Sequence, residues 1–293
     1  MMVLTRPATS PWRMPLRAWR EVVVSTWNEA MEDNIGLAAA GVAFYVFLAI
    51  VPLLTAIVLT YGIFAEPATV IRHMRALTEV MPAAAARSVG EQLMTVVKGS
   101  DGRKGAGLIV AIAVALFGAR NGAGALVSAL NIAYDEKETR SFLRINLIAL
   151  TITVAGAVGA ILAALSIAGM TAIGQLFPSD SRAFVILGTI ISYALLTLVG
   201  AGAAGALYRY APCRARARWV WISPGSILAG LLWLGLTLGF GTYVSHIAHY
   251  DASYGSLGAA IGLLSWMYLS GYVLLFGAEL NSELDQRANR GAV

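Results

Sequence analysis

The chain has 293 residues, of which 58% are hydrophobic and 13% charged, with a formal net charge of +5. A typical soluble domain carries about 25% charged residues, so this chain has too little polar material to cover a soluble globule of its size. Composition therefore argues against a soluble enzyme, a disordered chain and a nucleic-acid-binding domain, and it predicts an all-α polytopic membrane protein.

Residues 15–33 are predicted to form an amphipathic helix ahead of the first membrane span. Apolar residues recur at spacings of three or four along this segment, opposite charged ones. They are Leu16, Trp19, Val23, Trp27 and Ala30. Tryptophans beside arginines suit a helix at the level of the lipid headgroups, and a plain stem before the membrane is the alternative. We assign residues 1–36 to this cytoplasmic segment and expect no cleavable signal peptide.

Six segments are long enough to cross a membrane, since a hydrocarbon core of ~30 Å needs ~20 helical residues. The predicted spans are Leu37–Phe64, Gly105–Tyr134, Leu147–Gly174, Ala183–Tyr208, Trp221–Ser245 and Gly255–Leu280. Together they give a six-helix transmembrane domain over residues 37–281, followed by a cytoplasmic tail over residues 282–293.

The distribution of Lys and Arg outside the spans predicts that both termini face the cytoplasm. Thirteen of these residues fall in segments on that side and seven on the other, as the positive-inside rule requires. The main exception is the outer loop, residues 65–104, where two amphipathic helices are expected on either side of Pro82. Capping the bundle, contacting lipid and binding a partner are the three roles considered for them.

Small residues at four-residue spacing are predicted to mark the places where helices pack closely. The stripes are Gly156/Ala160/Ala164, Gly202/Ala206, Gly235/Gly239 and Gly258/Gly262. Such stripes let helix backbones approach one another in lipid. They predict a tight bundle and do not identify a function.

Arg120 lies near the middle of the second predicted span, where an arginine costs ~2.5–3.5 kcal/mol on insertion scales. It is therefore expected to face the protein interior or a wet cavity. Glu279 is the candidate partner because it is an acid embedded in an apolar run late in the chain. Separate solvation of the two groups is the alternative.

Other polar groups within the spans extend this candidate site. Their side chains belong to Tyr45, Asn121, Asn131 and Asn281. With Arg120 and Glu279 they predict a polar, substrate-binding cavity that opens toward the cytoplasm, and hydrogen bonding between helices is their alternative role. Pro52 lies inside the first span, where it is expected to kink the helix or free a carbonyl.

The sequence contains no recognisable catalytic motif, because it has no P-loop, no nucleophile elbow and no paired catalytic carboxylates. Cys213 is the only cysteine, so neither an intrachain disulfide nor a thiolate cluster can form. His246, His249 and Asp251 lack the glutamate of a metalloprotease motif. We therefore expect no catalytic residues, no metal, no cofactor and no nucleic-acid partner.

Several strings resemble those of a known family. They are Ala43-Phe44-Tyr45 with Pro52-Leu53-Leu54, Ala129-Leu130-Asn131-Ile132-Ala133-Tyr134 continuing through Glu136 and Glu138 to Arg140 and Phe142, Tyr208-Arg209 with Pro212, Tyr254-Gly255-Ser256 with Gly258, and Gly277-Ala278-Glu279-Leu280-Asn281. In this order they resemble the YihY/BrkB family of bacterial inner-membrane proteins, from about Trp27 to Glu283.

The resemblance implies six spans in the inner membrane and a transport or lipid-translocation role. Some members are linked to serum resistance and others to the export of envelope lipid precursors. An old family label, ribonuclease BN, is at odds with these residues, because a ribonuclease needs metal ligands or acid–base groups that face water. Glu279 and Asn281 match a family string, whereas the importance of Arg120 depends on membrane energetics alone.

The leading hypothesis is an inner-membrane transporter or lipid translocase, with a cavity built from spans one, two and six and Arg120 binding an anionic headgroup. The alternative is a non-transporting scaffold that docks an envelope-assembly protein through the outer loop and the N-terminal helix. A membrane enzyme is the third hypothesis. Membrane lipids are the expected partners, and the sequence fixes neither the substrate nor the oligomeric state.

Overall fold

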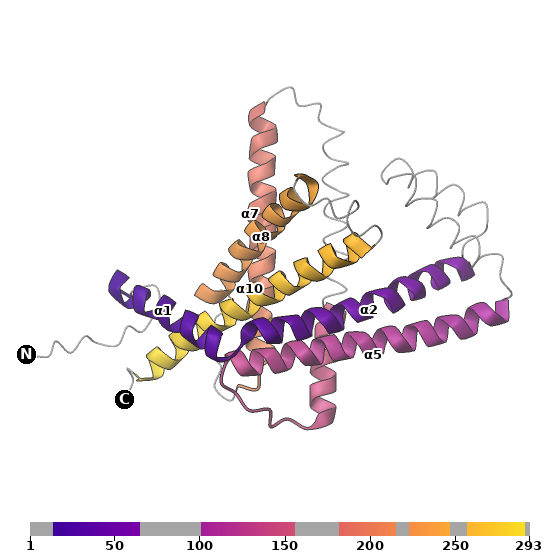
Figure 1. The fold of residues 1–293 in the computed structure, drawn as a ribbon, viewed down its shortest axis with the longest axis horizontal. Helices are drawn as coiled ribbons and strands as arrows, with labels where there is room; N and C mark the ends of the chain where they lie inside the picture. The colour runs from indigo at the N-terminus through magenta and orange to yellow at the C-terminus, as the bar shows by residue number, and fades with distance from the viewer. Residues whose placement is uncertain (1–13, 65–100, 156–181, 215–222, 247–256, 291–293) are drawn as a thin grey trace, which may run out of the picture. The chain divides into compact units, whose positions relative to one another are not determined.

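The structure, a computed structural model, describes residues 14–64, 101–155, 182–214, 223–246 and 257–290. The elements in chain order are α1 (Leu16–Glu32), α2 (Ile35–Phe64), α5 (Asp101–Ala133), α7 (Arg182–Tyr210), α8 (Pro224–His246) and α10 (Leu257–Arg290), as Figure 1 shows. A shorter apolar helix covers Phe142–Ala155. The all-α prediction is confirmed for these residues. Most of the predicted outer loop and the second half of the third predicted span lie outside them.

The chain divides into two units, each described by itself. The first consists of Met1–Phe44 with Ala123–Val293, and the second of Tyr45–Gly122. Helix α2 therefore begins in the first unit and ends in the second, and α5 does the reverse. Helices α1, α7, α8 and α10 belong wholly to the first unit.

Two described helices are long and apolar enough to cross a membrane, over Pro224–Tyr243 of α8 and Ala260–Ala288 of α10. A third candidate is α1 joined to the first part of α2, which are bent by 61° at their break. The count of six spans stays a prediction. Helix α10 runs to Arg290, beyond the predicted end of the sixth span at Leu280, because Leu284 still packs against Val22 and Leu280.

Helix α1 forms where the sequence predicts a helix, but a different face of it packs. The buried residues are Val22, Thr26 and Ala30. Two members of the predicted apolar stripe, Val23 and Trp27, are 53% and 55% exposed. The packed face lies toward α10, whose Leu280 and Leu284 cluster with Val22, so contact with α10 decides which side of α1 is buried.

The break between α1 and α2 is a local turn at Asn34. Its φ of 51° lies in the left-handed region, which asparagine adopts more readily than most residues. The Asn34 side chain donates a hydrogen bond of 2.9 Å from Nδ2 to the carbonyl of Glu32. Ile35 and Ala39 are buried immediately after the turn, so packing of the first turns of α2 holds the bend.

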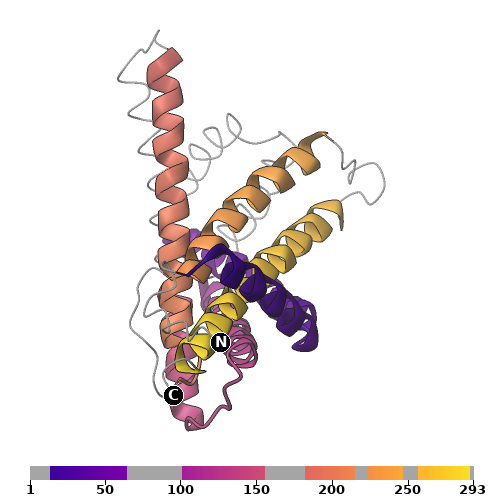
Figure 2. The same cartoon turned by 90° about the vertical axis from the view of Figure 1, so that its left-hand side faces the viewer.

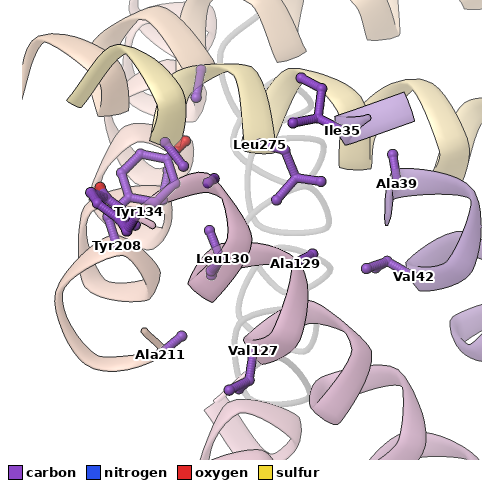
Figure 3. Packing of buried hydrophobic residues seen from close by; sticks show 14 of the residues in the cluster. Ile35, Ala39, Val42, Val127, Ala129, Leu130, Tyr134, Tyr208, Ala211 and Leu275 are labelled. Atoms are coloured by element: carbon purple, nitrogen blue, oxygen red, sulfur yellow. The ribbon is translucent and has the colours of Figure 1, made fainter. Parts of the chain in front are cut away.

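The core of the first unit draws on α2, α5, α7 and α10. Figure 3 shows Leu130 and Leu275 between the start of α2 on one side and the Tyr134–Tyr208 pair on the other. The two tyrosine rings meet edge-on with their centroids 6.4 Å apart, a favoured geometry for aromatic pairs. This core fixes the ends of α5 and α7, which carry most of the polar contacts described below.

Helix α8 packs against both α7 and α10, and the three lie together in both views (Figures 1 and 2). The tightest crossing joins Gly225 of α8 to Gly277 of α10: a Cβ added at Gly225 would lie 2.0 Å from the Gly277 carbonyl oxygen. On the α7 side, a Cβ at Gly230 would lie 2.9 Å from the carbonyl oxygen of Thr197. Glycine is required at these positions because main chain meets main chain.

The small-residue stripes predicted from the sequence are not where these crossings occur. Within the described residues, an added Cβ at Gly202, Gly235, Gly239 or Gly262 meets nothing within 4 Å. Four-residue spacing marks a groove on a helix but does not tell which groove a neighbour occupies. The Gly156/Ala160/Ala164 stripe lies outside the described residues.

In the second unit, α2 and α5 run side by side. A Cβ at Gly118 of α5 would lie 3.0 Å from Cα of Ala49, and one at Gly122 would lie 3.2 Å from a methyl carbon of Val46. These glycines let the two helices approach two residues before Arg120 and two residues after it, about half a turn on either side, so the backbone that carries Arg120 is held closely against α2.

Candidate functional site

Arg120 lies on α5 in the second unit with its side chain exposed. Its Nη1 donates a 2.8 Å hydrogen bond to Oδ1 of Asn121. The same helix exposes apolar side chains nearby, including Val114 at 48% and Phe117 at 66%. A guanidinium held by an adjacent amide therefore stands on an otherwise apolar helix surface. Glu279 belongs to the other unit, so its pairing with Arg120 stays a prediction.

Two further predicted residues lie on α2 in the second unit. Tyr45 is 39% exposed, and α2 continues past Pro52 to Phe64. The cavity predicted to join these residues to those of the first unit also stays a prediction.

Asn131, near the end of α5, is buried, and both the oxygen and the nitrogen of its side-chain amide form hydrogen bonds. Its Oδ1 accepts a 2.7 Å hydrogen bond from the backbone N–H of Cys213, and its Nδ2 donates one of 2.9 Å to Oε2 of Glu138. It thereby joins α5 to the segment that follows α7. These are hydrogen bonds between elements, and binding of a substrate by Asn131 stays a prediction.

Glu138 and Arg140 form a two-pronged ion pair in the turn after α5. Arg140 donates from Nε to Oε1 at 2.7 Å and from Nη2 to Oε2 at 2.6 Å, and it also reaches the carbonyl of Ala211 at 2.8 Å. Hydrogen bonds from Arg140 lower the pKa of Glu138 to about 2. The same carboxylate raises the pKa of Arg140. The pair thus anchors the turn to the end of α7.

Replacing Glu138 by glutamine is expected to remove an acid-sensitive part of the stability. The pKa of this carboxyl lies at about 2 in the folded chain against an ordinary 4.5, so its stabilisation is complete above about pH 4.5 and lost as pH falls toward 2. Allowing for its partial exposure, we expect about 1 kcal/mol. Thermal unfolding of both proteins in detergent should differ at pH 6 and converge near pH 2; a constant difference would contradict the assignment.

Asn281 of α10 caps the N-terminus of α8. Its Oδ1 accepts a 2.9 Å hydrogen bond from the backbone N–H of Gly225, and its Nδ2 donates one of 2.8 Å to Oγ of Ser223. Ser223 and Ser226 add a reciprocal pair of side-chain caps at the same helix end. Since the first N–H groups of a helix lack partners within it, Asn281 is occupied in holding α8 to α10.

Glu279 is 2% exposed and its Oε1 has no hydrogen-bond partner among the described residues. Asp33 at the α1–α2 break, Asp135 after α5 and Glu29 of α1 are acidic side chains that lie close enough to interact with Glu279 electrostatically. The sequence analysis missed Asp33 and Asp135. In the sequence, Asp33 is the last residue of the predicted N-terminal helix and Asp135 directly follows the second predicted span, so an acid at a helix end was the available signal.

Arg214 and Tyr134 form a further contact near this group. The Arg214 guanidinium carbon lies 4.3 Å from the centroid of the Tyr134 ring, and Arg214 also pairs with Asp285 of α10. A cation over an aromatic face is attracted by the negative face of the ring. Arg214 therefore fastens the segment after α7 to α5 and α10.

In the part of the chain that the structure describes, no three His, Cys, Asp or Glu side chains are arranged to hold a metal ion. His249 and Asp251 lie outside that part.

Comparison with known proteins gives matches over most of the chain. Residues 26–292 match the family described as Virulence factor BrkB. A ribonuclease-like protein, YfkH of Bacillus subtilis, is 35% identical over 190 residues, covering 64% of this chain and 69% of that protein. A UPF0761 membrane protein of Tolumonas auensis is 36% identical over 80 residues, covering 27% of this chain and 26% of its own. A UPF0761 membrane protein of Alkalilimnicola ehrlichii is 45% identical over 60 residues, covering 20% of this chain and 14% of that protein. No solved structure matches.

Proposed function

Because this chain belongs to the BrkB family of membrane proteins, we propose that it moves an anionic amphiphile, such as a lipid, across the bacterial inner membrane. Both termini lie in the cytoplasm in this proposal. Arg120 and Asn121 meet the anionic headgroup, and the apolar helix faces around them accommodate the acyl chains. The role involves no covalent step and no cofactor.

The observation that carries the proposal is the exposed Arg120 side chain on the apolar surface of α5. At the centre of a bilayer a guanidinium is costly unless water or a counter-charge reaches it. A phosphate or carboxylate headgroup supplies that charge through short, charge-assisted hydrogen bonds. The bond from Arg120 to Asn121 orients the planar guanidinium, so the donor fork is positioned before the ligand arrives.

The test is transbilayer movement of a fluorescent anionic phospholipid in liposomes that contain the purified protein. We expect wild type to exceed empty liposomes and Arg120→Ala to lose at least about tenfold of that rate, a change of 1.4 kcal/mol in binding. Arg120→Lys should retain part of the wild-type rate, because lysine keeps the positive charge but lacks the planar set of N–H donors of a guanidinium. Arg144→Ala, in the predicted cytoplasmic loop, is the matched control. Equal rates in wild type, Arg120→Ala and empty liposomes would overturn the proposal.

A scaffold is the second candidate, and the bonds of Asn131 and Asn281 favour it. Both amides hold helices together, as expected of a rigid support rather than a moving gate. A scaffold that docks an envelope-assembly protein through the outer loop requires residues 68–98 and tolerates Arg120→Ala. The envelope integrity of cells that carry Arg120→Ala or a deletion of residues 68–98 distinguishes the two functions. A transporter is expected to show a defect with Arg120→Ala, and a scaffold is expected to show none.

A further inference from the structure

Helix α1 presents three rows of side chains that differ in burial and polarity. The first row is buried and consists of Val22, Thr26 and Ala30. The second row, named here the outer apolar strip, is exposed and consists of Leu16, Val23, Val24, Trp27 and Met31. The third row is exposed and polar, and consists of Arg17, Glu21, Asn28 and Glu32. With about 3.6 residues per turn, the outer apolar strip lies between the buried row and the polar row.

The buried row packs on the part of α10 where that helix changes from apolar to polar. Val22 clusters with Leu280 and Leu284, and most residues of α10 from position 281 to 287 are polar. In both views α1 crosses α10 rather than running alongside it (Figures 1 and 2). Helix α10 is long and apolar enough to cross a membrane, so this change is where it is expected to leave the hydrocarbon. Helix α1 therefore lies across α10 at the level of the membrane surface.

Trp27 places the outer apolar strip on the hydrocarbon side of this boundary. Its ring meets the ring of Phe276 of α10 edge-on, with the two centroids 6.2 Å apart. Phe276 belongs to the apolar run of α10 that precedes Glu279, yet the Trp27 side chain stays exposed. Tryptophan is enriched where a membrane meets water, because its ring is apolar and its N–H is polar. The outer apolar strip thus faces lipid at the edge of the bilayer, and the polar row faces water.

Two arginines accompany the outer apolar strip without a counter-charge from the protein. Arg20 lies within the strip and Arg17 at its border with the polar row, and both side chains are exposed. No ion pair among the described residues includes either of them. The neighbouring acid, Glu21, pairs instead with Arg287 of α10 at 3.3 Å. Arginine side chains at a membrane surface extend toward the headgroups, where phosphate oxygens accept charge-assisted hydrogen bonds from the guanidinium.

We propose that the exposed face of α1 is a surface that binds anionic lipid, with the outer apolar strip immersed beside the acyl chains and Arg17 and Arg20 on the headgroup phosphates. In the predicted orientation this is the cytoplasmic surface of the inner membrane. A helix with an apolar and a charged face lies in the plane of such an interface. The exposed apolar surface continues past the α1–α2 break with Leu37 and Phe44 of α2, so lipid covers both helices.

The surface differs from the apolar stripe predicted from the sequence, and it goes beyond the proposed function. Trp19 and Ala30 of that stripe pack against the protein, whereas Val24 and Met31 lie on the exposed side. The burial pattern, and not hydrophobic periodicity, identifies the face that meets lipid. Binding of α1 to the membrane does not require that the protein move lipid.

The placement is tested with nitroxide spin labels on the full-length protein in liposomes of phosphatidylcholine and phosphatidylglycerol. Cys213 is the only cysteine, so Cys213→Ser provides a background for Val23→Cys in the outer apolar strip or Asn28→Cys in the polar row. Both positions are exposed on the same helix, which makes them a matched pair. The label at position 23 is expected to collide mainly with oxygen, which concentrates in lipid, and the label at position 28 mainly with a water-soluble nickel chelate.

Three results would overturn the proposal. Collision of both labels mainly with the nickel chelate would mean that α1 lies in water. Collision of both mainly with oxygen would mean that α1 is embedded as part of a membrane span. Protection of the label at position 23 from both reagents would mean that protein, and not lipid, covers the outer apolar strip.

The arginines are tested with brominated lipids, which quench a fluorescent label on the Val23→Cys protein only when they lie beside it. Brominated phosphatidylglycerol should be enriched there over brominated phosphatidylcholine, by about fivefold for each arginine. Arg17→Gln combined with Arg20→Gln should abolish the enrichment. Arg144→Gln, at an exposed position of another helix, should preserve it. Equal quenching by the two lipids without these substitutions, or enrichment that survives the double substitution, would overturn the assignment of Arg17 and Arg20.

Discussion

Replacing Gly225 by alanine is expected to lower the apparent melting temperature of the protein by about 5–10 °C, from about 3 kcal/mol of overpacking. The new Cβ would lie 2.0 Å from the carbonyl oxygen of Gly277 and 2.7 Å from the Asn281 amide carbon. The closer of these contacts is with main chain, which cannot move aside by a side-chain rotation. Gly277→Ala should act in the same direction, because its Cβ would lie 2.5 Å from the Tyr208 hydroxyl.

Gly235→Ala on the same helix is the matched control. An added Cβ there meets nothing within 4 Å in the described part of the chain, and alanine favours helix over glycine by about 0.5–1 kcal/mol. This variant should melt at the wild-type temperature or slightly above it. Equal melting of Gly225→Ala and Gly235→Ala, followed by intrinsic fluorescence in detergent, would show that α8 and α10 do not cross at Gly225.

The second large effect is expected from Asn281→Ala. The change leaves the buried Gly225 N–H without the acceptor that now lies at 2.9 Å, and it removes the 2.8 Å bond to the Ser223 hydroxyl, which keeps its bond with the Ser226 N–H. A buried polar group left unpaired costs about 1–3 kcal/mol and a lost hydrogen bond about 1 kcal/mol, so we expect about 2–4 kcal/mol in total. Thermal unfolding in detergent measures the loss.

Ser223→Ala tests the hydroxyl partner of Asn281. It removes the bond to Asn281 and the cap that Ser223 provides to the Ser226 N–H, and it keeps the contact of Asn281 with the Gly225 N–H, so we expect a loss of about 1–2 kcal/mol. Asn28→Ala, at an exposed position of α1, should have no measurable effect. Wild-type melting of Asn281→Ala would instead return this residue to the substrate-binding role that its position in a span first suggested.

Helix positions were largely predictable because long apolar runs leave the backbone few alternatives in a membrane. The predicted spans Ala183–Tyr208 and Trp221–Ser245 agree with α7 and α8 to within a few residues. Helix α10 runs ten residues beyond the predicted end of the sixth span at Leu280, since its last turns are held by contacts with α1 that a hydropathy pattern does not contain. The face of α1 that packs was missed for the same reason.

The candidate site was less predictable, because an amide in a membrane span has the same donors and acceptors whether it binds a ligand or a helix. Sequence position alone left both roles open for Asn131 and Asn281, and the helix-joining partners of the two amides lie 82 and 56 residues away along the chain. Asp33, which interacts with Glu279 electrostatically, lies still farther from it in sequence. Glu279 stood out because its flanks are apolar, whereas Asp33 looked like an ordinary polar residue at a helix end.

The contact of bare backbones at Gly225 and Gly277 restricts where anything can travel through this protein. Because the two helix backbones meet here with no side chain between them, an acyl chain or a solute cannot pass between α8 and α10 at this crossing. A route across the bilayer must therefore follow the outside of this helix pair or run along other helices. If the protein moves lipid as proposed, cysteines introduced on either side of the crossing and linked by a short reagent should leave the rate of that movement unchanged.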